Sequence, residues 1–136
     1  MITQSPPFTA LAGAKYLSLT TFRKSGDPVT TPVWFAEKDG KLYVFTFPGA
    51  GKVKRIRHTA RVRLAPCTVN GKATGPVSEA RACIISEQEG KKLADTALAK
   101  KYGLTWRLYN AGMGALRAIR RRPKTERVYL AIEPAE

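Results

Sequence analysis

The sequence predicts a mainly β protein, an antiparallel β-barrel of about six strands with helices packed on its outside. Runs rich in β-branched and aromatic residues are separated by turn signals of the kind that join antiparallel strands. Helical patterns interrupt these runs in two regions, after the third strand and before the last one. Closing the sheet into a barrel would remove the exposed edges that a short meander leaves.

The first part of the chain predicts three strands, at residues 16–22, 29–36 and 42–47. A Ser-Gly-Asp-Pro turn separates the first two, and an Asp-Gly pair is a strong two-residue hairpin signal between the second and the third. The third strand is apolar on both faces except for Thr46, so both faces must be covered. A barrel of this size covers only one of them internally, and we therefore expect a homodimer.

The rest of the barrel is predicted from residue 51 onward. A Pro-Gly-Ala-Gly run ends the third strand and opens a short basic helix at residues 52–58. Two strands follow, one at residues 61–65 and a long one that leads from an Asn70-Gly71 hairpin signal to about residue 85. Alternating apolar residues at 128–132 predict the last strand.

Two helical stretches are predicted before the last strand. Ser86 and Glu89 have the S-x-x-E spacing of a capping box, so a helix should begin there and run to about Tyr102. Residues 104–121 form a second helical stretch, which two glycines weaken, so we expect it as one helix or two pieces.

Composition predicts a single domain spanning residues 1–136. Hydrophobic residues make up 43% and charged residues 25%, which is ordinary for a globular protein and excludes a disordered one. No apolar run approaches the roughly 20 residues of a membrane-spanning helix. The first residues also lack the basic start and apolar run of a signal peptide, so we expect a cytoplasmic protein with no membrane partner.

No metal site is expected. Cys67 and Cys83 belong to no CxxC motif, and His58 is the single histidine, which excludes an ordinary zinc site. We expect both cysteines to be reduced, partly buried thiols. His58 is expected at the surface or in a helix cap, and Glu79 is expected to form a structural ion pair with Arg81 on one face of a strand.

The charge balance is the compositional outlier. Twenty-four Lys and Arg against ten Asp and Glu give a net charge of +14, which indicates an anionic partner or ligand. One basic cluster occupies residues 52–63. A second lies at residues 117–127 and includes Arg120, Arg121, Arg122 and Lys124. The second cluster is as consistent with a solvated surface as with a site for an anionic ligand.

The first cluster has the chemistry of a phosphate site. A helix N-terminus presents free backbone N–H groups and the positive end of a dipole, and Gly49 and Gly51 allow close approach of the backbone. Lys52 and Arg55 supply full charges, and Thr46 can offer a hydroxyl group. The alternative is an amphipathic surface helix whose basic residues are merely solvated.

The segment Thr31-Pro32-Val33-Trp34 predicts an interrupted strand. Proline cannot donate a hydrogen bond to the ladder, so Pro32 belongs at a sheet edge or a bulge. Neighbouring backbone groups would then be free to bond the carbonyl groups and ring nitrogens of a flat heterocycle. The position of Trp34 is as consistent with the core or a dimer interface as with contact to such a heterocycle.

Five segments in a fixed order carry a family resemblance: KYLSLTT at 15–21, TTPVWF at 30–35, LYVFT at 42–46, GKVKRIR at 51–57 and RVRL at 61–64. Together they resemble the pyridoxamine 5'-phosphate oxidase-like family, in the branch that uses the deazaflavin coenzyme F420. The resemblance implies a six-stranded split β-barrel of the FMN-binding type, with the cofactor in a groove at the interface of a homodimer.

In such families the cofactor ring packs against the second and third strands, and the phosphate is held by the loop and helix that follow. The residues that match these positions here are Thr31, Pro32, Val33, Trp34, Thr46, Gly51, Lys52, Val53, Lys54 and Arg55.

The resemblance implies an F420-dependent oxidoreductase that transfers a hydride between the cofactor and a small organic substrate. The chemistry then belongs to the cofactor, and no catalytic side chain is expected. FMN is the alternative cofactor, because it shares the phosphate and lacks only the anionic tail that the basic surface would suit. Pyridoxamine phosphate oxidase activity is disfavoured, since that enzyme's C-terminal substrate-binding Arg and His are not matched. A haem function is disfavoured because His58 is the one available imidazole.

A basic nucleic-acid-binding barrel is the alternative from another class. The isoelectric point near 10.3 and the clustered arginines are its electrostatic signature. Against it, Tyr43, Phe45 and Phe47 lie in a strand too apolar for an open base-stacking platform.

Overall fold

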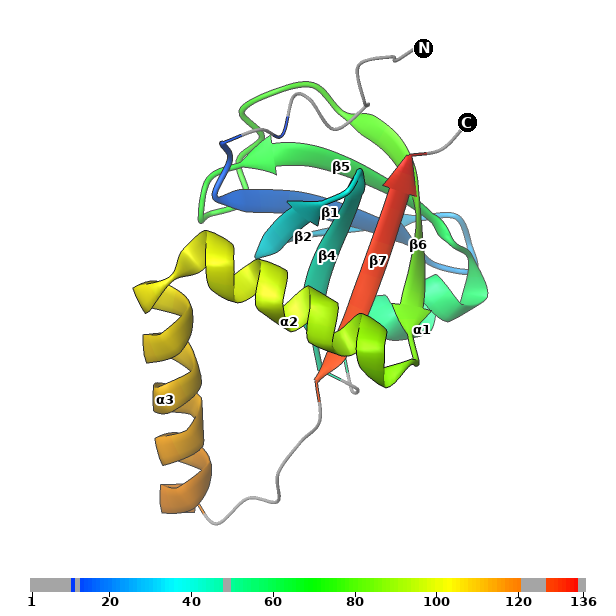
Figure 1. The fold of residues 1–136 in the computed structure, drawn as a ribbon. Coiled ribbons are helices and arrows are strands. Elements are labelled where there is room, and N and C mark those ends of the chain that lie inside the picture. The colour runs from blue at the N-terminus through cyan, green and yellow to red at the C-terminus, as the bar shows by residue number, and fades with distance from the viewer. Residues whose placement is uncertain (1–10, 12, 48–49, 121–126, 135–136) are drawn as a thin grey trace.

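The structure, a computed structural model, describes residues 11, 13–47, 50–120 and 127–134, without the side chains of 113–120. It is one seven-stranded antiparallel sheet, curled in the manner of a split barrel, with three helices outside it (Figure 1). The strand order is β2-β1-β5-β6-β7-β4-β3. The strands are β1 (Tyr16–Phe22), β2 (Pro28–Val33), β3 (Phe35–Lys38), β4 (Lys41–Thr46), β5 (Arg61–Cys67), β6 (Ser78–Ile85) and β7 (Val128–Pro134).

The strand count exceeds the predicted six because the strand expected at residues 29–36 is broken at Trp34. Its first half, β2, pairs with β1, and its second half, β3, pairs with β4. The two halves therefore lie at opposite edges of the sheet, although only Trp34 separates them in the chain. Pro32 lies on the edge strand β2, where it faces Ser18 of β1, which confirms that this proline lies at a sheet edge.

The concave side of the sheet encloses the main apolar core. Leu42 faces Ile132 across the β4–β7 ladder, Val44 faces Leu130, and all four side chains are fully buried. Alternate residues of β1 and β5 complete this core. Burying each such side chain contributes roughly 1.5–3 kcal/mol relative to leaving it in water.

The convex side of β4 and β7 carries a second apolar cluster. Tyr43 and Tyr129 pack there with Leu98 and Trp106, which come from the helices α2 (Gln88–Tyr102) and α3 (Leu104–Arg120). The third predicted strand is thus covered on both faces, as expected, but this chain's own helices cover the outer face. The expectation that only a second subunit could do so is wrong.

The helices differ from the expectations in detail. The short basic helix is α1 (Gly51–His58). Helix α2 begins after Glu87, whose backbone is extended and whose side chain makes no capping hydrogen bond, so the predicted capping box at Ser86 does not form. It ends at Gly103, whose φ of 54° is a conformation that glycine adopts readily. Helix α3 is a single piece and extends away from the sheet (Figure 1).

Of the two hairpin signals, one joins adjacent strands directly. Asp39 and Gly40 both have positive φ, 53° and 83°, as a type I′ turn between β3 and β4 requires. Gly71 also closes a turn, donating its N–H to the Thr68 carbonyl at 2.8 Å, but β6 begins only at Ser78.

Three smaller expectations are resolved. Cys67 and Cys83 are both free thiols, but only Cys67 is buried; Cys83 is exposed because it points outward from β6. The ion pair expected between Glu79 and Arg81 does not form. Glu79 instead bridges Arg61 at 3.3 Å and Arg63 at 2.7 Å on the neighbouring strand. No described helix is long and apolar enough to span a membrane.

Candidate functional site

The N-terminus of α1 lies directly after β4 and is the first candidate site. Ala50 is its N-cap and offers no capping side chain, and the first turn contains no acidic residue. The helix is held by Val53 and Ile56, which are buried against the sheet. The first-turn N–H groups therefore have neither a capping side chain nor a nearby carboxylate of their own helix, the situation that favours an anion.

Arg55 is fixed in place across this N-terminus. Its Nε donates a hydrogen bond of 2.6 Å to Oγ1 of Thr21, a residue of β1 that is 1% exposed. A Cβ atom at Gly51 would lie 2.6 Å from Nη1 of Arg55, so the guanidinium lies over the first residue of α1. The glycine thus leaves room for the arginine at the start of the helix.

The charges around Arg55 are of one sign. Burial and the neighbouring Arg55 lower the pKa of Lys52, and burial and Arg23 lower the pKa of Arg55. In the described part of the chain, none of the ion pairs within 4.0 Å includes Arg23, Lys52 or Arg55. An anion placed among them would relieve both the desolvation and the mutual repulsion.

The other residues predicted around the phosphate differ in how exposed they are. Thr46 is buried at the end of β4. The side chain of Val53 is also buried, so Val53 can offer a ligand only its backbone N–H, which also donates to the Ala50 carbonyl at 3.1 Å. Lys54 is exposed on α1. Gly49 lies outside the described residues.

The predicted ring-binding segment lies at the corner where β2 becomes β3. Thr31 faces Leu19 across the ladder and is partly exposed, Pro32 is exposed, and Val33 is buried in the barrel core. Trp34 follows at the break between the two strands and is partly exposed.

Trp34 belongs to an aromatic cluster that the sequence reasoning did not assemble. Its ring stacks on Tyr102 with centroids 4.7 Å apart and lies 5.1 Å from Tyr109. The guanidinium of Arg127 lies 4.9 Å from the ring centroids of both Phe45 and Trp106.

A signal in the sequence could have found part of this cluster. Trp106 and Tyr109 are three residues apart, the spacing of one helix face. Trp106 is buried against its own chain. Phe45, the neighbour of Thr46, lies 6.1 Å from Trp34, so β4 connects the aromatic cluster to the α1 region.

The second basic cluster adds nothing to this geometry, because residues 121–126 and the side chain of Arg120 lie outside the described part of the structure. The described residues also contain no group of three or more His, Cys, Asp or Glu side chains arranged to hold a metal ion.

The sequence model of the family described as pyridoxamine 5'-phosphate oxidase matches residues 8–131. The chain belongs to the pyridoxamine 5'-phosphate oxidase family. The family match spans every described strand at least in part, from β1 to β7. No curated protein matches the sequence.

Solved structures share the fold of this family member at low sequence identity. A FAD-binding protein from Mesorhizobium loti is 18% identical with a TM-score of 0.63, over 93% of this chain and 84% of that one. The haem storage protein HutZ from Vibrio cholerae is 13% identical with a TM-score of 0.65, over 91% and 84%. An F420 reductase is 18% identical with a TM-score of 0.57, over 98% and 97%. One split-barrel fold therefore serves proteins described by different cofactors.

Proposed function

We propose that this family member is an F420-dependent oxidoreductase acting on a small organic substrate, with the cofactor phosphate held at the N-terminus of α1. The observation that carries the proposal is the group of cations around Arg55, which no described carboxylate neutralises. F420 would supply hydride-transfer chemistry through its deazaflavin ring. The chain itself would bind, orient and shield the cofactor.

In this proposal the residues divide into two groups. Gly51, Lys52 and Arg55 hold the phosphate, together with the hydroxyl of Thr46 and the backbone of Val53, and Lys54 meets the anionic tail. The edge segment Thr31 to Trp34 supports the ring: the exposed edge of β2 offers backbone groups, and Trp34 limits access of water. FMN remains the alternative because it would use the same phosphate group.

The proposal includes a homodimer, which rests on exposed leucines of α3 rather than on the apolar strand β4. Leu104 and Leu108 of α3 are 67% and 63% exposed, on a helix that extends away from the sheet (Figure 1). Large apolar side chains in such a position favour a contact with a second copy.

A nucleic-acid-binding barrel is less well supported. Tyr43 is buried beneath α2, and Phe45 contacts the ring of Trp106, so neither offers a free face for stacking bases.

Titration of the purified protein with F420 and, separately, with FMN, followed by absorbance and fluorescence, tests the proposal. We expect F420 to bind more tightly at low salt, with a difference that shrinks as salt screens the exposed tail contacts over about 8–10 Å. Tighter binding of FMN at low salt would reject F420. Failure of both to bind would reject the phosphate site as well.

A further inference from the structure

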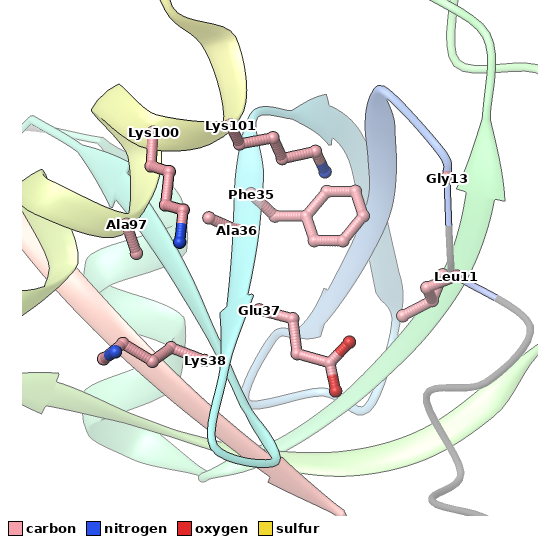
Figure 2. Close-up of a pocket in the computed structure, with 9 residues that line it drawn as sticks. All are labelled: Leu11, Gly13, Phe35, Ala36, Glu37, Lys38, Ala97, Lys100 and Lys101. Carbon is pink, nitrogen blue, oxygen red and sulfur yellow. The ribbon is translucent and has the colours of Figure 1, made fainter.

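A pocket lies away from α1, between the edge strand β3 and the C-terminal part of α2 (Figure 2). Its volume is about 450 Å³. Leu11, Phe35 and Ala97 give it apolar walls, and three lysines, Lys38, Lys100 and Lys101, line it with one carboxylate, that of Glu37. None of its lining residues belongs to the proposed cofactor site.

The backbone of β3 shows which polar groups face this pocket. The Phe35 N–H donates to the Tyr102 hydroxyl at 3.0 Å, so Phe35 directs its N–H away from β4. Backbone groups alternate in direction along an antiparallel strand, and Glu37 is two residues further on. The N–H and C=O of Glu37 therefore point to the same outer edge.

The hairpin supports this assignment. Lys38 and Lys41 flank the two-residue turn and face each other, the position of a hydrogen-bonded pair, so Glu37 and Leu42 form the next, non-bonded pair. Strand β3 is the last of the sheet, and within the described residues no strand pairs with its outer edge. Glu37 thus presents one backbone donor and one backbone acceptor beside the pocket.

Lys101 adds a positive charge to the same pocket. Its Nζ lies 3.3 Å from the centroid of the Phe35 ring, and no described carboxylate pairs with it within 4.0 Å. Although the residue as a whole is exposed, this packing desolvates the amine and lowers the pKa of Lys101 to about 8, against a smaller opposing effect of Glu37. Lys101 would gain from a carboxylate placed beside it.

We infer that this pocket is a second ligand site, for a small organic carboxylate that also carries an amide N–H and an apolar group, as an N-acylated amino acid does. The carboxylate accepts the Glu37 N–H and the Lys101 ammonium, and the amide N–H donates to the Glu37 carbonyl. The apolar group packs against Leu11, on the face of β3 that carries the Phe35 ring. Lys38 and Lys100 raise the local positive potential.

N-acetyl-phenylalanine is a suitable probe, and N-acetyl-phenylalaninamide is its neutral counterpart. In ¹H–¹⁵N spectra of the full chain we expect the acid to shift the Glu37 amide resonance and the amide counterpart to bind at least about tenfold more weakly, the scale of one hydrogen bond to a charged group. Lys101→Met should weaken binding of the acid by a similar factor, and Lys101→Arg should restore part of it. Lys92→Met, an exposed change on the same helix, should leave it unchanged.

Proton uptake provides an independent measurement. Calorimetric titrations in buffers of different ionisation enthalpy should show uptake on binding near pH 8.5 and little at pH 6, because the carboxylate raises the pKa of Lys101. Glu37, Lys38, Lys100 and Tyr102 are the other titratable groups around the amine, so Lys101→Met must abolish the uptake. Equal affinity for acid and amide, shifts that avoid Glu37, uptake that survives in Lys101→Met, or no binding of the acid at millimolar concentration would each overturn the inference.

Discussion

The hydroxyl of Tyr102 accepts the backbone N–H of Phe35 at 3.0 Å, across 67 residues of sequence. The same hydroxyl lies 2.6 Å from the Lys15 carbonyl and 3.0 Å from the Phe35 carbonyl, to either of which it can donate. Phe35 is the first residue of β3, and Lys15 immediately precedes β1. A side chain from α2 therefore links the edge strand β3 to the start of β1, the strand next to the opposite edge, and no ladder joins these two strands.

Replacing Tyr102 with Phe should lower the free energy of unfolding by about 1–3 kcal/mol, because it leaves the Phe35 N–H without its partner while keeping the ring that stacks on Trp34. Urea unfolding followed by tryptophan fluorescence would measure the loss. Tyr109→Phe is the matched control, since that hydroxyl makes no hydrogen bond in the described structure. A similar loss in both variants would show that the Phe35 contact is not the cause.

Removing the Thr21 hydroxyl should affect cofactor binding through Arg55. Thr21→Val deletes the acceptor of the Arg55 Nε hydrogen bond, and we expect the Kd for both F420 and FMN to rise about five- to tenfold, equivalent to about 1–1.4 kcal/mol. Thr21→Ser should restore the affinity. Thr20→Val is the control, because Thr20 bonds the exposed Thr30 hydroxyl instead.

Charge variants on α1 should separate the two cofactors. Lys52→Ala should weaken both by about 1.5–3 kcal/mol through the shared phosphate. Lys54→Ala and Arg57→Ala, at exposed positions, should weaken F420 and leave FMN nearly unchanged if they meet the tail. Titrations at low and high salt would measure both effects. Losses of equal size for the two cofactors in the Lys54 and Arg57 variants would place the tail elsewhere.

The desolvated amine of Lys101 predicts a pH dependence of stability. Its pKa is about 8 in the folded protein, below the ordinary 10.5. Below pH 8 the ammonium is present in both states and its burial costs stability. That cost disappears as the pH rises from 8 to 10.5, where only the unfolded state holds the proton.

Lys101→Met should therefore stabilise the protein at pH 7, by no more than about 1 kcal/mol because the residue is exposed, and the gain should vanish by pH 10.5. Urea unfolding at several pH values, with Lys92→Met as the control, would follow it. A gain that does not change with pH would point to apolar packing of the methionine rather than to the charge.

Exposed leucines on α3 predict the association state. Sedimentation should give a species of twice the 14.9 kDa chain mass, and Leu104→Glu with Leu108→Glu should convert it to the monomer without loss of the fold. A wild-type monomer at micromolar concentration would contradict the dimer.

Sequence reasoning succeeds where the physics is local. The Asp39-Gly40 turn and β1 follow from turn chemistry and residue type, and α1 from the glycine-rich break before it. The interruption near Trp34 was predicted, but the division into strands at opposite sheet edges was not, because it depends on β1 and β4 each pairing with part of one segment. Arg127 over Phe45 and Trp106 was also beyond reach, since a cation–π contact between distant elements leaves no periodic signal.

The division of one segment between opposite sheet edges also sets an order of assembly. The β1–β2 and β3–β4 hairpins are each made from neighbouring residues and can form early, but β5, β6 and β7 must enter between them. The second neighbour of β4 is β7, which lies near the end of the chain. Loop closures of that length slow folding, so the free edge of β4 is the last to be protected. While the chain is incomplete, that apolar strand is the place where two copies would pair wrongly.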